Sequence, residues 1–356
     1  MRETARRAFV GAVVVVAVVV SALALWELKL LLAVLFLAFI IAAAMRPGVQ
    51  ALARKRVPRS VGIGAHYVAL FALVGLLLYF VVPTAADQVS EAVPSSSDEL
   101  AEETRQSRGV KHEVLVGIQR RLDNLPRTDE IAERALDPAL EITVTAFEIT
   151  VGIFFTLAAA AYWIYERDRA VDLVTSFVPH TKRKRVRDTW DLIDAKLGAY
   201  VRGQLLLIAV VATVLSFAFW AIGLPFWLLV GIFAGVVEIV PVVGPLAAGA
   251  LAVGVGLTDS IGVAAAAGLI VLTVRLVEDY LVIPRVLGDA VGLTPLTVLV
   301  AVSGVAFLFG GFAVLLAIPF AAVIATLVDV LARHVDPAEE DVPTVLFPAK
   351  DAEGAG

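Results

Sequence analysis

Long apolar runs constrain this chain more than any other feature of its sequence. An α-helix needs about 20 predominantly apolar residues to cross a bilayer, and the chain contains several runs of about that length. It is 60% hydrophobic and only 18% charged over 356 residues, whereas globular domains are about half apolar and a quarter charged. We therefore predict an all-α polytopic membrane protein.

The apolar runs predict about eight transmembrane segments. They cover residues 8–26, 30–45, 61–82, 146–165, 205–222, 226–257, 261–283 and 296–331. Two of them exceed one straight crossing and carry helix-breaking residues, so we expect them to be broken or re-entrant near Pro241 and Gly310. The first run also fits a signal peptide, but a second run follows almost at once, which favours a membrane anchor.

Basic loops give the expected orientation. The loop 46–59 has five basic residues and no acidic one, and such loops stay on the cytoplasmic side. The arginines near the N-terminus predict the same side, so both chain ends are expected in the cytoplasm, with the protein in a bacterial inner membrane. A second basic cluster consists of Lys182, Arg183, Lys184 and Arg185. Next to a span, we expect it to contact anionic lipid headgroups rather than nucleic acid.

Composition divides the chain into five regions. They are 1–83 with the first three spans, 84–145 as an acidic extracytoplasmic region, 146–202 with the fourth span and a basic cytoplasmic amphipathic helix, 203–333 as a transmembrane core, and 334–356 as an acidic tail. Apolar residues recur at helical spacing in the second region, which favours a small helical extramembrane unit. A flexible acidic loop is the alternative there, and the tail is expected to be disordered.

The segment 238–249 reads EIVPVVGPLAAG in the middle of an apolar run. The residues Pro241, Gly244 and Pro245 predict a break with a half-helix on each side. Half-helix ends near the midplane commonly form ion and substrate sites in secondary transporters. A charge at that depth costs at least about 2.5 kcal/mol, so Glu238 indicates a functional group. The alternative places Glu238 at the membrane surface, with PVVGP as an ordinary loop.

A second acidic element reads RLVEDYLVIPRVLG. Arg275 precedes Glu278 by three residues and Asp279 by four, so the three side chains can meet on one helix face. Paired charges within a bilayer mark ion or substrate paths. A helix end at the water interface is an equally good interpretation of this segment.

Together these motifs resemble the autoinducer-2 exporter family of bacterial permease-like proteins. The resemblance rests on RPGVQALARKRVPRSVG, LGAYVRGQ, IVPVVGP, VEDYLVIPRVLGDAVGLTPL and GGFAVLLAIPFAA, which extend over nearly the whole chain. It implies about eight spans, homo-oligomers, and either export of small polar signalling molecules or sodium–proton exchange. The positions that it marks are Glu238, Pro241, Gly244, Pro245, Glu278, Pro284, Gly288 and Pro295. Asp279 departs from the family pattern, which often has an uncharged polar residue there.

We therefore expect a secondary transporter that exports a small polar solute with proton or sodium coupling, and 203–333 is then its transport core. A sodium/proton antiporter and a passive channel or membrane scaffold are the alternatives. No P-loop pattern is present, so ATP is not expected to drive transport directly. The chain has no cysteine and four scattered histidines. The segment 301–304, AVSG, lacks the first glycine of a GxSG serine-enzyme motif, and no histidine lies in the spans adjacent to Ser303. These features predict neither a metal, a cofactor nor an enzyme.

Overall fold

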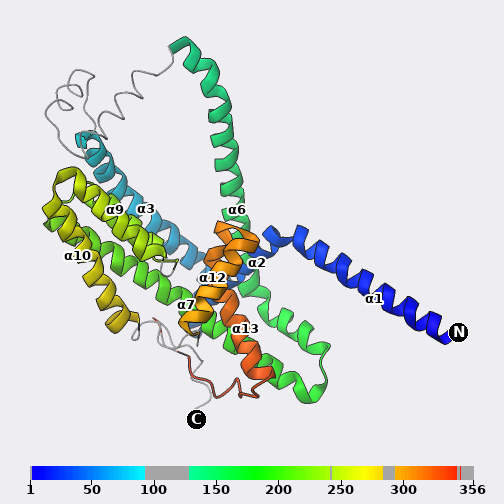
Figure 1. The fold of residues 1–356 in the computed structure, drawn as a ribbon. Helices are drawn as coiled ribbons and strands as arrows, with labels where there is room; N and C mark the ends of the chain where they lie inside the picture. The colour runs from blue at the N-terminus through cyan, green and yellow to red at the C-terminus, as the bar shows by residue number, and fades with distance from the viewer. Residues whose placement is uncertain (1, 93–127, 241–242, 284–292, 343–344, 346–356) are drawn as a thin grey trace.

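The structure, a computed structural model, describes residues 2–92, 128–240, 243–283, 293–342 and 345, and helices dominate it (Figure 1). The N-terminal half contains α1 (Arg2–Glu27), α2 (Lys29–Arg54), α3 (Arg59–Ala92), α6 (Thr128–Ser176) and α7 (His180–Ala221). The C-terminal half contains α8 (Trp227–Val237), α9 (Val243–Asp259), α10 (Ile261–Val277), a π-helical turn η1 (Glu278–Val282), α12 (Pro295–Phe309), a 3₁₀ turn η2 (Gly311–Leu316) and α13 (Ala317–Leu331).

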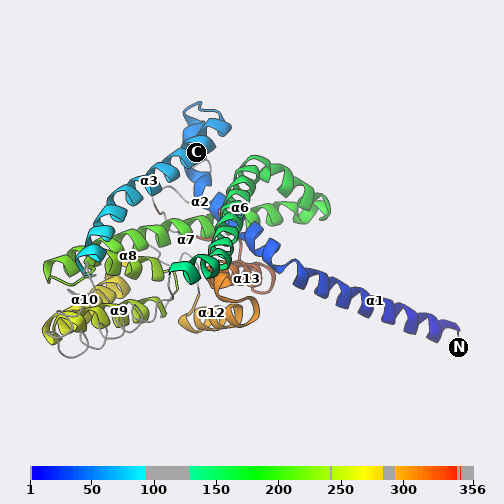
Figure 2. The same ribbon diagram turned by 90° about the horizontal axis from the view of Figure 1, so that it is seen from above.

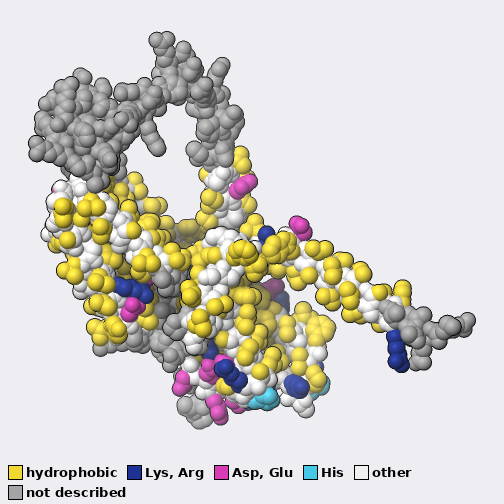
Figure 3. Space-filling view, viewed as in Figure 1, with side chains coloured by type: hydrophobic (Ala, Val, Ile, Leu, Met, Phe, Trp, Pro, Cys, Tyr) yellow, Lys and Arg dark blue, Asp and Glu magenta, His cyan; other side chains and the backbone are white. Residues whose placement is uncertain are grey.

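Seven helical segments in the described ranges are long and apolar enough to cross a membrane. They are Phe9–Glu27, Lys29–Arg54, Arg59–Gln88, Val144–Ser176, His180–Ala221, Ile261–Val282 and Ala313–Leu331. Most described apolar side chains of α1, α3 and residues 144–155 of α6 are exposed, and Figure 3 shows hydrophobic side chains covering the projecting α1. An apolar surface of this extent requires lipid or protein to cover it. The predicted all-α polytopic fold is confirmed.

Both predicted breaks are present. At 1.5 Å per residue, α8 is about 16 Å long, about half the thickness of the hydrocarbon core. It ends at Val237, and α9, which packs against it, begins at Val243. In the last long run, α12 ends at Phe309, and the next residue, Gly310, has a φ of 84°, which is open to glycine but strained for other residues. The long runs therefore form pairs of packed short helices instead of straight crossings.

One hydrophobic core joins α7, α8, α9 and α10, with Phe219 fully buried in it. The small-residue motif GIFAG lets α8 approach α7 closely. A Cβ on Gly231 would lie 2.2 Å from Ser216 Oγ, and one on Gly235 would lie 2.7 Å from the carbonyl oxygen of Ile208. This core holds the α8–α9 break at a fixed position against α7 and α10.

A second packing centre surrounds α2. Its small residues Ala38 and Ala42 pack on Ala160 of α6, and its Ile40 and Ala43 pack against α7 and α13. Figure 2 shows α2 enclosed by α6, α7 and α13, whereas α1 extends away from the bundle. The core of α7, α8, α9 and α10 and the packing centre around α2 therefore form two packed units that share α7.

The basic start of α7 continues without interruption into its apolar part, which agrees with the predicted amphipathic helix that feeds a span. Arg183 donates a hydrogen bond from Nε to the carbonyl oxygen of Val178 at 3.0 Å. Arg185 donates to the carbonyl oxygen of Val330 near the end of α13. Lys182 and Lys184 are exposed, so the contact of this cluster with anionic headgroups stays a prediction.

A network of charged side chains joins α2, α6 and α7 near one end of the bundle. Asp194 of α7 is only 5% exposed, and its Oδ2 accepts hydrogen bonds from Arg46 Nη1 at 2.9 Å and Arg167 Nε at 2.8 Å. Asp191, one turn earlier on α7, pairs with the same two arginines. Because the charges come from three helices, the network fixes the position of α2 and α6 against α7.

We expect Asp194→Asn to destabilise the protein by roughly 3 kcal/mol, because it removes the buried one of the two carboxylates that pair with Arg46 and Arg167. Thermal unfolding of the detergent-solubilised protein measures this effect. Asp188→Asn, on the same helix but with no ion pair among the described residues, is the matched control. Equal unfolding temperatures for the two variants would contradict the structural role of Asp194.

The extramembrane region 84–145 and the tail 334–356 are each described only in part. The helix α3 continues to Ala92 and α6 begins at Thr128, while 93–127 lies outside the described residues. Part of the predicted tail, residues 334–342 and 345, belongs to the described residues, and Pro337 and Val345 are buried in it. Val345 is 4% exposed and packs on Ala199, and its carbonyl oxygen accepts a hydrogen bond from Arg202 Nε at 2.9 Å. The apolar tail residues therefore cover a helix face that the acidic composition did not reveal.

Candidate functional site

Four charged side chains meet where α8 ends beside the end of α10. Arg275, in the last turn of α10, donates from Nη1 to Glu238 Oε1 at 2.6 Å and lies 3.4 Å from Glu278 Oε2. Its Nη2 lies 2.8 Å from Asp279 Oδ1. One guanidinium group thus binds three carboxylates, and we call these four residues the Arg275 cluster.

The local sequence explains how α10 presents this cluster. Ser260 caps the start of α10 by accepting a hydrogen bond from the backbone N–H of Val263 at 3.2 Å. At the other end the helix widens into the π-helical turn η1, which begins at Glu278. Such turns are rare, and many of them occur at functional sites. The turn brings Glu278 and Asp279 together around Arg275.

The break between α8 and α9 positions Glu238. Glu238 follows the last residue of α8, and its carbonyl oxygen accepts a hydrogen bond from Gln204 Nε2 of α7 at 3.2 Å. The chain then reverses, with the Gly244 N–H donating to the carbonyl oxygen of Val240 at 2.8 Å. A Cβ on Gly244 would lie 2.1 Å from the carbonyl oxygen of Val237. Only glycine therefore allows α9 to start this close to the end of α8.

The Arg275 cluster has an excess of negative charge. Its three carboxylates face one guanidinium group, so full ionisation leaves two negative charges. Glu238 is 7% exposed and Glu278 is 4% exposed, while the Asp279 side chain is 40% exposed. Glu278 Oε1 is buried and has no hydrogen-bond partner among the described residues. A buried carboxylate oxygen without a donor is costly unless it receives a proton or a cation.

Metal coordination by protein carboxylates alone is not evident at this cluster. Within the described ranges no group of three or more His, Asp or Glu side chains is arranged to hold a metal ion.

The remaining predicted site residues either lie at the starts of helices or fall outside the described residues. Pro295 is the first residue of α12, where Thr294 caps the helix by accepting a hydrogen bond from the backbone N–H of Thr297. Proline fits this position because its missing N–H has no helical partner there. Pro245 lies in the first turn of α9, where proline is likewise tolerated. The residues Pro241, Pro284 and Gly288 lie outside the described residues.

Sequence reasoning missed the contact that joins the two acidic elements. The spacing of three and four residues predicted that Arg275 meets Glu278 and Asp279. Glu238 is 37 residues from Arg275, and no local sequence pattern indicates that the two side chains pair. Gln204 was also missed, although an amide at the start of an apolar span is a usable signal. The π-helical turn has no sequence pattern that distinguishes it from an ordinary helix end.

Comparison with known proteins agrees with the membrane architecture. Residues 14–333 match the family described as "AI-2E family transporter". The chain is 24% identical over 297 residues to "Putative transport protein YrrI" of Bacillus subtilis (strain 168), covering 82% of this chain and 83% of that protein. It is 28% identical over 345 residues to "Putative transport protein MT0215" of Mycobacterium tuberculosis (strain CDC 1551 / Oshkosh), covering 93% and 91%.

The predicted resemblance is therefore confirmed over nearly the whole chain, and the relatives are named as transport proteins. With its helical membrane fold and its match from residue 14 to 333, the chain belongs to the AI-2E family of transporters.

Proposed function

We propose that this membrane transporter exports a small polar solute in exchange for protons or sodium ions. The observation that carries the proposal is the Arg275 cluster, in which Glu238 and Glu278 are buried beside a helix break. Ionisable groups inside membrane proteins are costly and mark ion or substrate paths. An enzyme lacks comparable support, because no catalytic constellation was found in the sequence.

The cluster couples the ion to the solute through the Glu238–Arg275 pair. When Glu238 is ionised, the pair ties the end of α8 to α10 at 2.6 Å. A proton or cation on Glu238 neutralises its charge and releases Arg275 to Glu278 and Asp279, which stay within its reach. The break between α8 and α9 is then free to move relative to α10, which opens the path for the solute.

We place the protein in the inner membrane of a bacterium, with both chain ends in the cytoplasm, because basic loops flank the first spans. The family relationship supports a homo-oligomer, and the exposed apolar surface of α1 leaves room for contacts with other subunits or with lipid. The sites proposed for coupling are Glu238, Arg275, Glu278 and Asp279, with Gly244 and Pro245 shaping the break.

A sodium/proton antiporter is the second candidate, and the carboxylate excess of the Arg275 cluster favours it. Three carboxylates around one arginine provide competing positions for a proton and a cation without any solute. Both candidates use the same carboxylates and differ in what leaves the cell.

We expect Glu238→Gln to abolish sodium-dependent proton movement, because glutamine cannot exchange a proton. Proteoliposomes that contain a trapped pH dye and respond to external sodium provide the measurement. Asp259→Asn, an exposed carboxylate at the end of α9, is the matched control and should transport normally.

The outcomes separate the candidates. A sodium-dependent pH change that only Glu238→Gln loses supports coupling at the Arg275 cluster. If the wild type moves no protons with sodium, sodium coupling is wrong, and the assay is repeated with a proton gradient and labelled polar solutes. Equal responses in the wild type and Glu238→Gln would remove Glu238 as the coupling group.

A further inference from the structure

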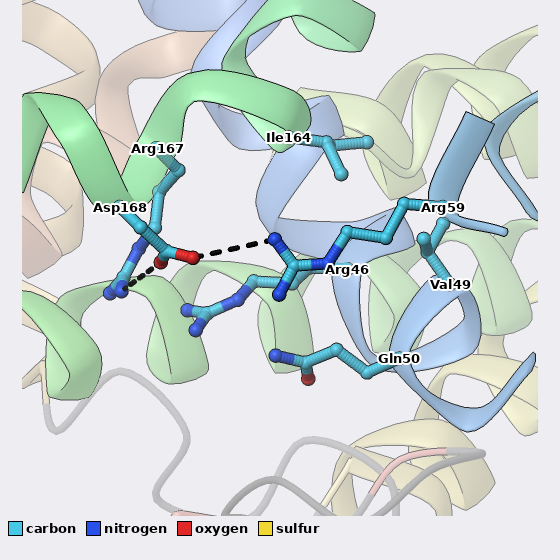
Figure 4. Close-up of a pocket in the computed structure, with 7 residues that line it drawn as sticks. All are labelled: Arg46, Val49, Gln50, Arg59, Ile164, Arg167 and Asp168. Carbon is cyan, nitrogen blue, oxygen red and sulfur yellow. Dashed lines mark hydrogen bonds and ion pairs between the residues drawn. The ribbon is translucent and has the colours of Figure 1, made fainter. Parts of the chain in front are cut away.

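A polar cavity lies between α2, α3 and α6, away from the Arg275 cluster. It has a volume of about 60 Å³ and is lined by Arg46, Val49, Gln50, Arg59, Ile164, Arg167 and Asp168. Because one water needs about 10–15 Å³ of such volume, the cavity holds roughly four waters or one tetrahedral oxyanion. Figure 4 shows that the three arginine side chains approach the same space from different helices.

The lining is more basic than the surrounding network. Three arginines and one aspartate line the cavity, whereas Asp191 and Asp194 of α7 do not. Those two carboxylates bind Arg46 and Arg167 from the α7 side and hold them in place. The three guanidinium groups are thus matched by three carboxylates, and Arg46 and Arg167 are fixed at the cavity wall.

Two further donors are available to a ligand. Within the described residues, the one ion pair of Arg59 is a 3.4 Å contact from its Nη1 to Asp168, and its side chain is 55% exposed. The Gln50 side-chain amide has no hydrogen-bond partner within the described part of the chain. A ligand with several acceptor oxygens can engage both groups, since arginine presents up to five donors in a planar fork.

The cavity lies at the depth expected for lipid headgroups. Tyr165, which is 59% exposed, is within one turn of both Ile164 and Arg167 on α6, and Tyr162, which is 71% exposed, is within one turn of Ile164. Exposed tyrosines on membrane helices mark the interface between hydrocarbon and water. The same end of the bundle carries the basic loop between α2 and α3.

We propose that this cavity binds the phosphate group of an anionic ligand, through Arg46, Arg59, Arg167 and Gln50. The source of the phosphate is either a lipid headgroup or a soluble phosphate compound. Binding ties the start of α3 to α2 and α6, which Arg59 otherwise reaches through its 3.4 Å contact with Asp168. The proposal is independent of the transported solute and of the coupling ion.

The test uses thermal unfolding of the purified full-length protein with short-chain phosphatidylglycerol or inorganic phosphate at constant ionic strength. We expect stabilisation with an apparent Kd that Arg59→Gln weakens about tenfold, the value of one lost charge-assisted hydrogen bond. Arg169→Gln is the matched control, because Arg169 is 82% exposed on the same helix α6 and pairs only at 3.7 Å with Glu166. Gln50→Ala is a second variant that leaves every ion pair intact and should also weaken binding.

The result also identifies the source. Stabilisation by phosphatidylglycerol alone assigns the cavity to a lipid headgroup, and stabilisation by inorganic phosphate assigns it to a soluble oxyanion. Equal responses in the wild type, Arg59→Gln and Arg169→Gln would overturn the proposal, as would an equal response to phosphatidylcholine of the same chain length. No stabilisation by either ligand would also overturn it.

Discussion

Replacing Arg275 with glutamine is expected to destabilise the protein by about 3–5 kcal/mol, the usual effect of removing one partner from a buried ion pair. The change leaves Glu238 and Glu278, both less than a tenth exposed, without their shared cation. Thermal or denaturant unfolding in detergent measures the loss. It should be smaller in acidic than in alkaline buffer, because protonation neutralises the carboxylates that the variant leaves unpaired.

Arg333→Gln is the matched control for this variant. Arg333 pairs with Asp329 one turn earlier at 2.8 Å, the same distance as the pair of Arg275 with Asp279, but its side chain is 73% exposed. Exposed pairs of this kind contribute about 0–1 kcal/mol. A similar loss in both variants would contradict the buried environment of the Arg275 cluster.

A triple variant separates stability from coupling. Combining Arg275→Gln with Glu238→Gln and Glu278→Gln leaves no buried charge without its partner, and that unpaired charge is the main cost of removing one member of a buried ion pair. We expect the triple variant to recover most of the stability that Arg275→Gln loses. Coupled transport in proteoliposomes should stay absent, because no carboxylate remains at the buried positions. Recovery of transport would show that the cluster is only structural.

The fold could be predicted from the sequence because its main signals are local. Apolar length fixes the membrane class, and glycine and proline fix the two breaks, so Gly244 and Gly310 were visible without a structure. Apolar length alone does not determine the number of crossings, because a long apolar run forms either one tilted helix or two shorter helices that pack against each other. The packed pair of α8 and α9 depends on Gly231 and Gly235 against α7, which is a tertiary contact.

The candidate site could be predicted only in part for the same reason. The i, i+3 and i, i+4 spacing placed Arg275 near Glu278 and Asp279. The pairing with Glu238 depends on how α8 and α10 pack, and so does the hydrogen bond from Gln204. The network of Arg46, Arg167 and Asp194 was also missed, because its members come from three helices that are distant in the sequence.

A methyl group at Gly244 is expected to disrupt the break and to stop transport. Its Cβ would lie 2.1 Å from the carbonyl oxygen of Val237 and 2.7 Å from the carbonyl carbon, so the clash is with backbone that cannot rotate away. Overpacking costs about 1–3 kcal/mol in adaptable cores, and we expect Gly244→Ala at the upper end of that range. The displaced backbone also moves Glu238, which directly follows Val237, away from Arg275.

Gly254→Ala tests whether this effect belongs to the break and not to helix α9 in general. Gly254 lies on the same helix, and a Cβ there would meet nothing within 4 Å. Alanine in an exposed helix interior stabilises by about 0.5–1 kcal/mol relative to glycine, so this variant should unfold at the same or a higher temperature and transport normally. If both variants behave alike in unfolding and in proteoliposome transport, the close approach of α9 to the end of α8 is not required. A loss confined to Gly244→Ala would tie transport to the geometry that holds Glu238 against Arg275.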